Sequence, residues 1–257
     1  KIVFNSEWSK KQFLKNLESF YHKSKKLIVI HQSINQSNVD IRKKQKIISF
    51  VGKLNSAKGY DIFCQAIIKI LNKYPTWKAV VAGDEPREII NVKHKNLVNL
   101  GFQNHKKILE LFKKTSIAVA CSRWEEPFGR TSLEAASRGC AVIISNRGGL
   151  PETITNGIIL RKLNSINLYN AISKLITSKN DLIDLQTKSK NNFYLTDKFI
   201  SNKIDEYRKA LISSFVVTPL KTSLQKKLKI LHVTNFNERH NGRLFYNTGK
   251  RLHNGFI

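Results

Sequence analysis

Apolar and polar positions alternate between short runs typical of buried strands and longer stretches with helical spacing. From residue 46 onward, four apolar runs predict strands: "KIISFVG", "WKAVVAG", "SIAVACS" and "CAVIIS". Between the first two, residues 59–75 place their apolar side chains on one helical face, at Ile62, Phe63, Ala66, Ile67, Ile70 and Leu71. Strands joined through helices predict a parallel sheet that helices cover on both faces. The fold class is therefore α/β, with a doubly wound, Rossmann-like sheet.

The same pattern divides the chain into five regions. Residues 1–45 hold a strand, a helix, a second strand and a polar connector, and residues 46–195 form the doubly wound domain. Residues 196–215 carry an amphipathic helix, 216–227 a linker, and 228–257 an apolar strand followed by a glycine-bearing loop and a helical pattern. That last region resembles the opening of a second Rossmann-like unit, and about 30 residues are too few to bury a core of their own. Because the chain contains no methionine, even at position 1, we expect it to be a piece of a longer protein.

The excess of basic over acidic residues limits which partners the chain is expected to bind. The 257 residues include 45 Lys and Arg against 18 Asp and Glu, a formal net charge of +27. Such a chain is attracted to nucleic acid, to anionic membrane surfaces or to phosphate-bearing substrates. The lysines are spread along the chain, without an aromatic-interleaved basic stripe, zinc-ligand spacing or an RNA-binding motif, so nucleic acid is disfavoured as the main partner.

The remaining composition bears on membrane insertion and on disulfide bonding. No apolar run approaches the roughly 18 residues of a membrane-spanning helix. Three cysteines, each within an apolar pattern, indicate buried, reduced thiols in a cytosolic protein.

Ligands of open α/β sheets bind beyond the carboxyl ends of the strands, and two such ends are rich in polar groups. The first predicted strand is followed by "GKLNSAKG", in which Gly52 and Gly59 let the backbone approach a ligand. The ammonium groups of Lys53 and Lys58 are suited to neutralise a diphosphate. Taken alone, the loop is better explained as an ordinary solvated turn between a strand and a helix, because lysines are common in such loops.

The second polar end is "RWEEPFGRTSLE", after the strand "SIAVACS". A helix is predicted to begin near Arg130 and Thr131, where free backbone N–H groups and the Arg130 charge form an anion site. Glu134, one turn inside that helix, is placed to accept hydrogen bonds from sugar hydroxyls. Glu126 lies on the loop facing the same cleft, although an acid near a helix N-terminus also simply stabilises the helix.

These residues carry a family resemblance. "EPFGRTSLE" (Glu126 to Glu134) resembles the glutamate-x7-glutamate signature of the retaining glycosyltransferases of family four (group 1), which have the GT-B fold. Three further stretches resemble that family's phosphate loop, base loop and Gly-Gly-Pro-Glu stretch: "FVGKLNSAKG", "NLGFQNHKKILELFKKTSIAVACS" and "RGCAVIISNRGGLPETITNG". The four motifs follow the family's order between residues 46 and 178. Residues 1–45 resemble the end of the family's N-terminal domain and its interdomain crossing, and residues 228–257 the start of another such N-terminal domain.

The resemblance implies a chemistry and a set of site residues. The chain would bind a UDP- or GDP-sugar and transfer the sugar, with retention, to an acceptor hydroxyl on a glycan or lipid-linked molecule. No metal or other cofactor is implied. The implied donor-binding residues are Gly52, Lys53, Lys58, Phe102, Gln103, Glu126, Phe128, Gly129, Arg130, Thr131 and Glu134.

Among the implied residues, Glu126, Lys58 and Lys53 are expected to act in catalysis. Glu126 would lie against the donor sugar or phosphate face, and the fixed cations Lys58 and Lys53 would stabilise the negative charge that gathers on the departing diphosphate. Lys53 stands where the family usually has arginine, so the bidentate grip on phosphate is lost. The family's acceptor-binding domain is missing before Lys1, which puts activity of the chain alone in doubt.

The expected setting is synthesis of cell-surface polysaccharide or lipopolysaccharide, in the cytoplasm and peripherally at the inner face of the membrane. Two alternatives stay open. One is a basic module that binds nucleic acid or anionic lipid without catalysis. The other keeps the fold but makes the chain a GT-B phosphorylase or a sugar-nucleotide epimerase, although the sequence holds no pyridoxal-lysine motif.

Overall fold

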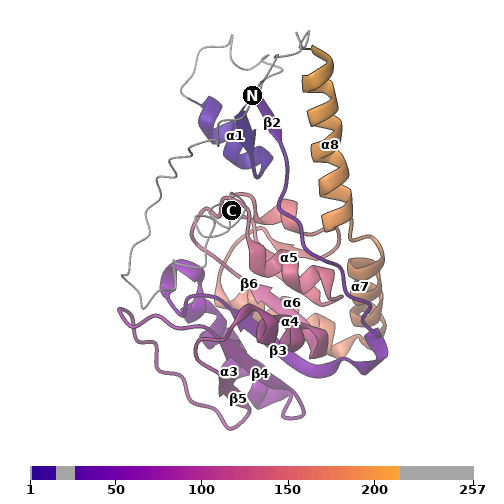
Figure 1. The fold of residues 1–257 in the computed structure, drawn as a ribbon. Helices are drawn as coiled ribbons and strands as arrows, with labels where there is room; N and C mark the ends of the chain where they lie inside the picture. Colours follow the sequence, from indigo (N-terminus) through magenta and orange to yellow (C-terminus); the bar gives the residue numbers. More distant parts are fainter. Residues whose placement is uncertain (1, 16–26, 215–257) are drawn as a thin grey trace. The chain divides into compact units, whose positions relative to one another are not determined.

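The structure is a computed structural model and describes residues 2–15 and 27–214 (Figure 1). The predicted linker at 216–227 and the second Rossmann-like unit at 228–257 lie outside the described residues.

A parallel sheet of six strands forms the centre of the domain, in the order β5-β4-β3-β6-β7-β8. The strands are β3 (Gln45–Val51), β4 (Lys78–Ala82), β5 (Leu97–Asn99), β6 (Thr115–Ala120), β7 (Ala141–Ser145) and β8 (Ile158–Leu160). The chain starts in the middle at β3, runs outward to β5, and returns to pair β6 with the other side of β3. The predicted doubly wound sheet is thus confirmed, and its switch point lies between β3 and β6.

Helices cover both faces of this sheet. One core cluster joins α3 (Tyr60–Lys73) and α6 (Ser165–Thr177) to side chains such as Phe50 and Ile143. The other joins α4 (His105–Lys114) and α5 (Arg130–Ser137) to Val142 and Ile144, and Figure 1 shows α4 and α5 over that face. Because successive strand residues point to opposite faces, Ile143 and Ile144 serve different clusters, which explains why the strands read as continuous apolar runs.

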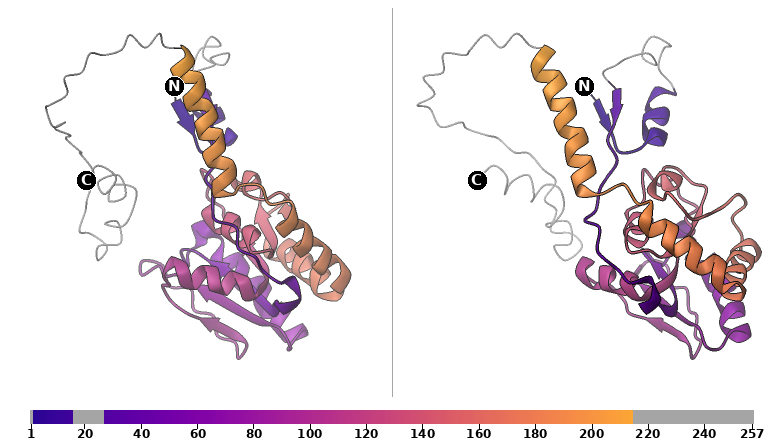
Figure 2. Two further views of the ribbon diagram at one scale, coloured as in Figure 1. Left: turned by 45° about the vertical axis from the view of Figure 1, so that its right-hand side comes forward. Right: turned by 90° about the vertical axis from the view of Figure 1, so that its right-hand side faces the viewer.

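The remaining helices follow the sheet in sequence. They are α7 (Lys179–Asn191) and α8 (Asp197–Ser214), the latter continuous along its length in Figure 2. Ile200 of α8 is buried in the second core cluster. None of the described helices is both long enough and apolar enough to cross a membrane.

The N-terminal residues form a second, two-stranded parallel sheet. β1 (Ile2–Phe4) pairs with β2 (Leu27–Val29), and α1 (Glu7–Leu14) follows β1. Ser6 caps α1, since its side chain accepts a hydrogen bond from the Ser9 N–H. The helix predicted for residues 7–21 is described only as far as α1.

Three short 3₁₀ helices were not predicted: η1 (Ile41–Lys43), η2 (Ser56–Lys58) and η3 (Leu150–Thr153). Of these, η1 lies in the predicted polar connector and η2 in the predicted glycine-lysine loop. In α4, Ile108 and Phe112 are buried in the second core cluster, and Leu109 and Leu111 pack against it while remaining partly exposed.

Candidate functional site

A cavity of ≈130 Å³ opens at the switch point of the sheet, where the carboxyl ends of β3 and β6 separate. Its walls come from the end of β3, η2, the end of β6 and the loop that follows it, the start of α5, and η3. The lining residues are Phe50, Val51, Gly52, Lys58, Ala120, Ser122, Glu126, Gly129, Arg130, Thr131, Ser132 and Leu150. The sequence-predicted glycine-lysine loop and the start of the predicted helix therefore meet at one cavity.

Lys58 and Glu126 form an ion pair at this cavity, 68 positions apart in the sequence. The Lys58 side chain is 33% exposed and that of Glu126 14%. Lys58 ends η2, and the Asn55 side chain fixes this turn by accepting a hydrogen bond from the Lys58 N–H at 3.0 Å. An ammonium group has three donors, so Lys58 can hold Glu126 and still donate to a ligand.

The amino end of α5 faces the same cavity without a side-chain cap. Its N-cap is Gly129, at φ 107°, and no side chain there bonds to the first N–H groups of the helix. A Cβ atom at this position would lie 2.5 Å from Cδ2 of Leu150. Glycine thus leaves the N–H groups of Arg130 and Thr131 open to an anion, which the helix dipole favours.

Glu134 lies one turn into α5 and is almost buried, with 8% of its side chain exposed. Its Oε1 accepts hydrogen bonds from Arg130 at 3.3 Å and from His105 Nε2 at 3.0 Å. Arg130 lines the cavity, so the Glu134 carboxylate is joined to the cavity wall by one side chain. No hydrogen bond from the described residues reaches Glu134 Oε2.

His105 was missed by sequence reasoning, which assigned no histidine to the site. It is the first residue of α4, directly after the N-cap Asn104. Its partner Glu134 is 29 positions away on another helix. Only the packing of α4 beside α5 brings the two together, so no local pattern marks the pair.

Four other predicted residues lie outside the cavity wall. Lys53 is exposed, Phe102 is 58% exposed, and Gln103 follows it on the loop after β5. That loop borders a neighbouring hollow of ≈340 Å³ through Gly101. Phe128 is 1% exposed and stacks on the His31 ring at 5.4 Å, so its place is in the core beneath the cavity.

An exposed ion pair braces the η2 loop against the end of β6. Arg123 donates to both carboxylate oxygens of Asp61, at 2.5 and 2.6 Å, and to the Ser56 carbonyl at 2.5 Å. The hydrogen bonds from Arg123 hold the pKa of Asp61 below its usual value. This brace sets the position from which Lys58 reaches the cavity.

The Gly-Gly-Leu-Pro-Glu stretch (residues 148–152) forms hydrogen bonds to the loop that carries Glu125 and Glu126. The Gly149 N–H donates to the Glu126 carbonyl at 2.6 Å, and the Gly148 N–H to the Glu125 carboxylate at 2.5 Å. Gly148 has φ 59°, and a Cβ atom there would lie 2.1 Å from the Glu126 carbonyl oxygen. Glycine is therefore required for this close approach.

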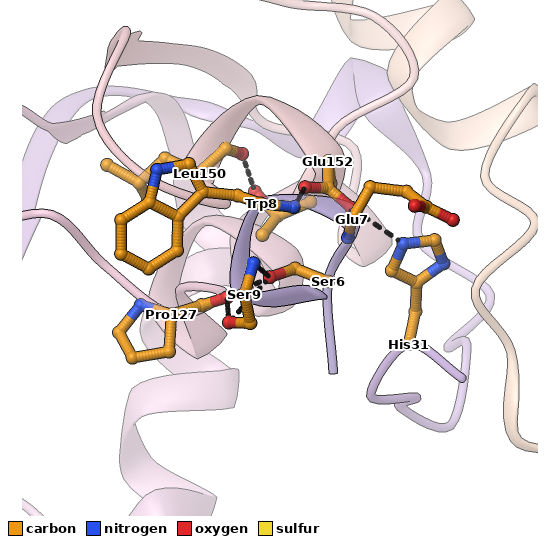
Figure 3. Close-up of polar contacts among 9 residues, drawn as sticks. Ser6, Glu7, Trp8, Ser9, His31, Pro127, Leu150 and Glu152 are labelled. Carbon is orange, nitrogen blue, oxygen red and sulfur yellow. Dashed lines mark hydrogen bonds and ion pairs between the residues drawn. The ribbon is translucent and has the colours of Figure 1, made fainter. Parts of the chain in front are cut away.

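Glu152, at the end of the same stretch, receives the N-terminal segment (Figure 3). Its carboxylate accepts from the backbone N–H groups of Glu7 and Trp8, at 2.7 and 2.9 Å, and contacts His31 Nε2 at 3.0 Å. Ser6 donates to the Pro127 carbonyl at 2.5 Å, on the loop that carries Glu126. The start of α1 is thereby attached both to Glu152 and to the loop that carries Glu126.

The geometry matches a known family. Residues 31–193 match the family described as Glycosyl transferases group 1, which is more than half of the chain. The chain belongs to this family.

Curated relatives of this group 1 glycosyltransferase carry different names. Spore coat protein SA of Bacillus subtilis (strain 168) is 32% identical over 151 residues, covering 52% of this chain and 40% of that protein. The lipopolysaccharide core biosynthesis mannosyltransferase LpsB of Rhizobium meliloti (strain 1021) is 30% identical over 123 residues, covering 44% of this chain and 35% of LpsB. The chain thus spans less than half the length of these curated relatives.

Solved structures show the same GT-B fold. The crystal structure of Anabaena Alr3699/HepE in complex with UDP and glucose superposes with a TM-score of 0.68 at 19% identity. The superposition covers 81% of this chain and 62% of that chain. At this identity the likeness establishes the fold alone.

Proposed function

We propose that this group 1 glycosyltransferase chain is the donor-binding half of an enzyme that takes a UDP- or GDP-sugar. The observation that carries the proposal is the switch-point cavity, where the Lys58 ammonium, the Arg130 side chain and the uncapped start of α5 face one space. Two cations and free N–H groups suit a diphosphate, which is the leaving group of a nucleotide sugar.

Roles for the surrounding residues follow from their places around the switch-point cavity. Glu134, held by Arg130 and His105, is placed to accept hydrogen bonds from the ribose hydroxyls through Oε2. Glu126, at the ion pair with Lys58, would meet the donor sugar. The base would extend over the neighbouring hollow beside Gly101, toward Phe102 and Gln103.

The proposed reaction is transfer to an acceptor hydroxyl with retention at the anomeric carbon, without a metal ion. The leaving diphosphate gains negative charge as the glycosidic bond opens, so Lys58 and the α5 amides would bind the transition state more tightly than the ground state. In the full-length protein, the configuration of the product's anomeric proton in an NMR spectrum tests retention. Activity abolished by EDTA and restored by a divalent ion would contradict the metal-free reaction.

The donor site is testable on this chain by thermal unfolding. A ligand at 100 times its Kd stabilises by about 2.7 kcal/mol, which for a domain of this size raises Tm by about 5–10 °C. We expect UDP or GDP to give such a rise, and Lys58→Gln to remove it. Lys198→Gln, a charge change on exposed α8, is the matched control. If no nucleoside diphosphate moves Tm, while nucleic acid binds with a steep salt dependence, the chain is a basic binding module instead.

We further propose that the enzyme serves cell-surface polysaccharide or lipopolysaccharide synthesis, peripherally at the cytoplasmic face of the membrane. The names of spore coat protein SA and LpsB support the first part, and the net charge of +27 supports the second. Sedimentation with anionic vesicles at low salt tests the location. Failure to bind such vesicles would contradict it.

A further inference from the structure

A second cavity, of ≈590 Å³, lies at the opposite end of the sheet from the switch point. It is formed where β3, β4 and β6 begin, and α7 and the end of α6 close it. The lining residues are Ile41, Arg42, Lys44, Lys46, Trp77, Ser116, Ile176, Lys179, Leu182, Ile183, Gln186 and Thr187. Its volume falls within the range of about 300–1,000 Å³ that small-molecule sites occupy.

One part of this cavity is apolar. Trp77 and Leu182 are 6% and 8% exposed and belong to the first core cluster. Ile183 of α7 is 43% exposed, although it faces this hollow. An apolar body would cover Ile183 and extend the core outward.

The other part is cationic, and no carboxylate lines it. Among the described residues, neither Lys46 nor Lys179 takes part in an ion pair, and both side chains are exposed. Arg42 adds a third charge at the rim, where it is paired with Asp40 at 3.1 Å. The cavity therefore offers unneutralised positive charge beside an apolar wall.

The deeper polar groups of the cavity are already satisfied within the protein. Lys44 donates to the carbonyls of Phe112 and Thr115, at 3.0 and 2.7 Å, and burial lowers its pKa. Gln186 donates to the Ser116 carbonyl at 3.0 Å. A ligand would thus meet apolar side chains in the interior and lysines at the mouth.

We propose that this cavity binds an amphiphilic anion, with its hydrocarbon body against Trp77, Leu182 and Ile183 and its phosphate or carboxylate head at Lys46 and Lys179. The charge complementarity and the division into an apolar wall and a cationic rim carry the assignment. The site is independent of the donor cavity, since the two share no lining residue.

Dodecyl phosphate, below its critical micelle concentration, is the probe. Trp77 is the one of the three tryptophans that lines the cavity, so its fluorescence should change on binding and the change should be absent in Trp77→Phe. By calorimetry we expect Lys46→Gln combined with Lys179→Gln to weaken binding about tenfold or more, because two charge-assisted hydrogen bonds are lost. Lys69→Gln combined with Lys198→Gln makes the same charge change at exposed sites elsewhere and should leave binding unchanged.

Two head-group controls make the proposal falsifiable. Equal binding of dodecyl maltoside, or equal loss of affinity in both double variants, would overturn it, because adsorption would then not depend on the head or on this site. Saturable binding of inorganic phosphate alone, measured by calorimetry, would also overturn the proposal. Anionic phosphatidylglycerol vesicles separate the sources. If vesicle binding depends on Lys46 and Lys179, the ligand is a membrane lipid. If vesicle binding does not depend on these lysines, while dodecyl phosphate still binds specifically, the ligand is a soluble amphiphile.

Discussion

Replacing Glu152 by glutamine is expected to detach the N-terminal segment while leaving the sheet domain folded. The Glu152 carboxylate accepts two backbone hydrogen bonds, from Glu7 and Trp8, at the positively polarised start of α1. Glutamine has one acceptor oxygen, and its NH₂ group would face a second N–H donor. One charge-assisted hydrogen bond is lost and the other becomes neutral.

The size of the effect follows from these two bonds. Hydrogen bonds to charged groups contribute about 1.5–3 kcal/mol each, against about 0.5–1.5 for neutral ones. Loss of one bond and weakening of the other therefore costs about 2.5–4.5 kcal/mol in the docking of α1. The opening equilibrium of the segment should rise about 70- to 2,000-fold.

Native-state hydrogen exchange measures this opening directly. The amides of Glu7 and Trp8 should exchange faster in Glu152→Gln by that factor, whereas the amides of the buried strand residues Ile143 and Ile144 should keep their rates. Glu206→Gln, on exposed α8, is the matched control. Unchanged exchange at Glu7 and Trp8 would refute the role of Glu152, and equal acceleration at Ile143 would show general unfolding instead.

Three further perturbations test the surroundings of the site. Gly129→Ala places a methyl group 2.5 Å from Leu150 Cδ2 at φ 107°, so it should cost about 1–3 kcal/mol and lower Tm in a thermal melt; an unchanged Tm would contradict the strain. Since Arg123 holds the pKa of Asp61 below its ordinary 3.8, the stability that the pair adds is present above about pH 4 and is lost as pH falls through the lowered pKa. Urea titrations should accordingly show Asp61→Asn less stable at pH 7 and equal to the parent at the acid end; a constant difference would contradict the linkage. Burial raises the thiol pKa of Cys64 to about 11 and of Cys121 to about 12, and Cys140 is also buried, so a thiol reagent should label all three only after unfolding; rapid labelling of the native chain would contradict their burial.

Most of the fold could be predicted from the sequence, because buried strands and buried helix faces produce apolar patterns within short stretches of the chain. Runs such as "CAVIIS" mark strands buried on both faces, and the spacing of Phe63, Ala66 and Ile70 marks one helical face. The turns η2 and η3 produce no such pattern, because they are short and depend in part on contacts with distant residues. Arg123, for example, reaches the Ser56 carbonyl from 67 positions away.

The site was predictable where its residues lie in recognisable motifs at the carboxyl ends of predicted strands. Gly129, Arg130 and Thr131 share one helix start, so their common cavity wall could be expected from spacing. The partnership of His105 with Glu134, and of Glu152 with α1, depends on how helices pack, which no single-sequence pattern encodes. Motif position also suggested Phe128 as a ligand contact, whereas its ring is buried against His31.

Calorimetric titration with UDP, UMP and uridine tests most directly the proposal that the switch-point cavity binds a diphosphate. If Lys58 and the start of α5 hold the two phosphates, the parent chain should bind UDP at least about tenfold more tightly than UMP, and uridine more weakly still. Lys58→Gln should then bring the affinity for UDP down to that for UMP, with Lys198→Gln as the unchanged control. Equal affinities of the parent for all three ligands, or a Lys58→Gln variant that binds UDP as the parent does, would contradict a diphosphate site at the switch point.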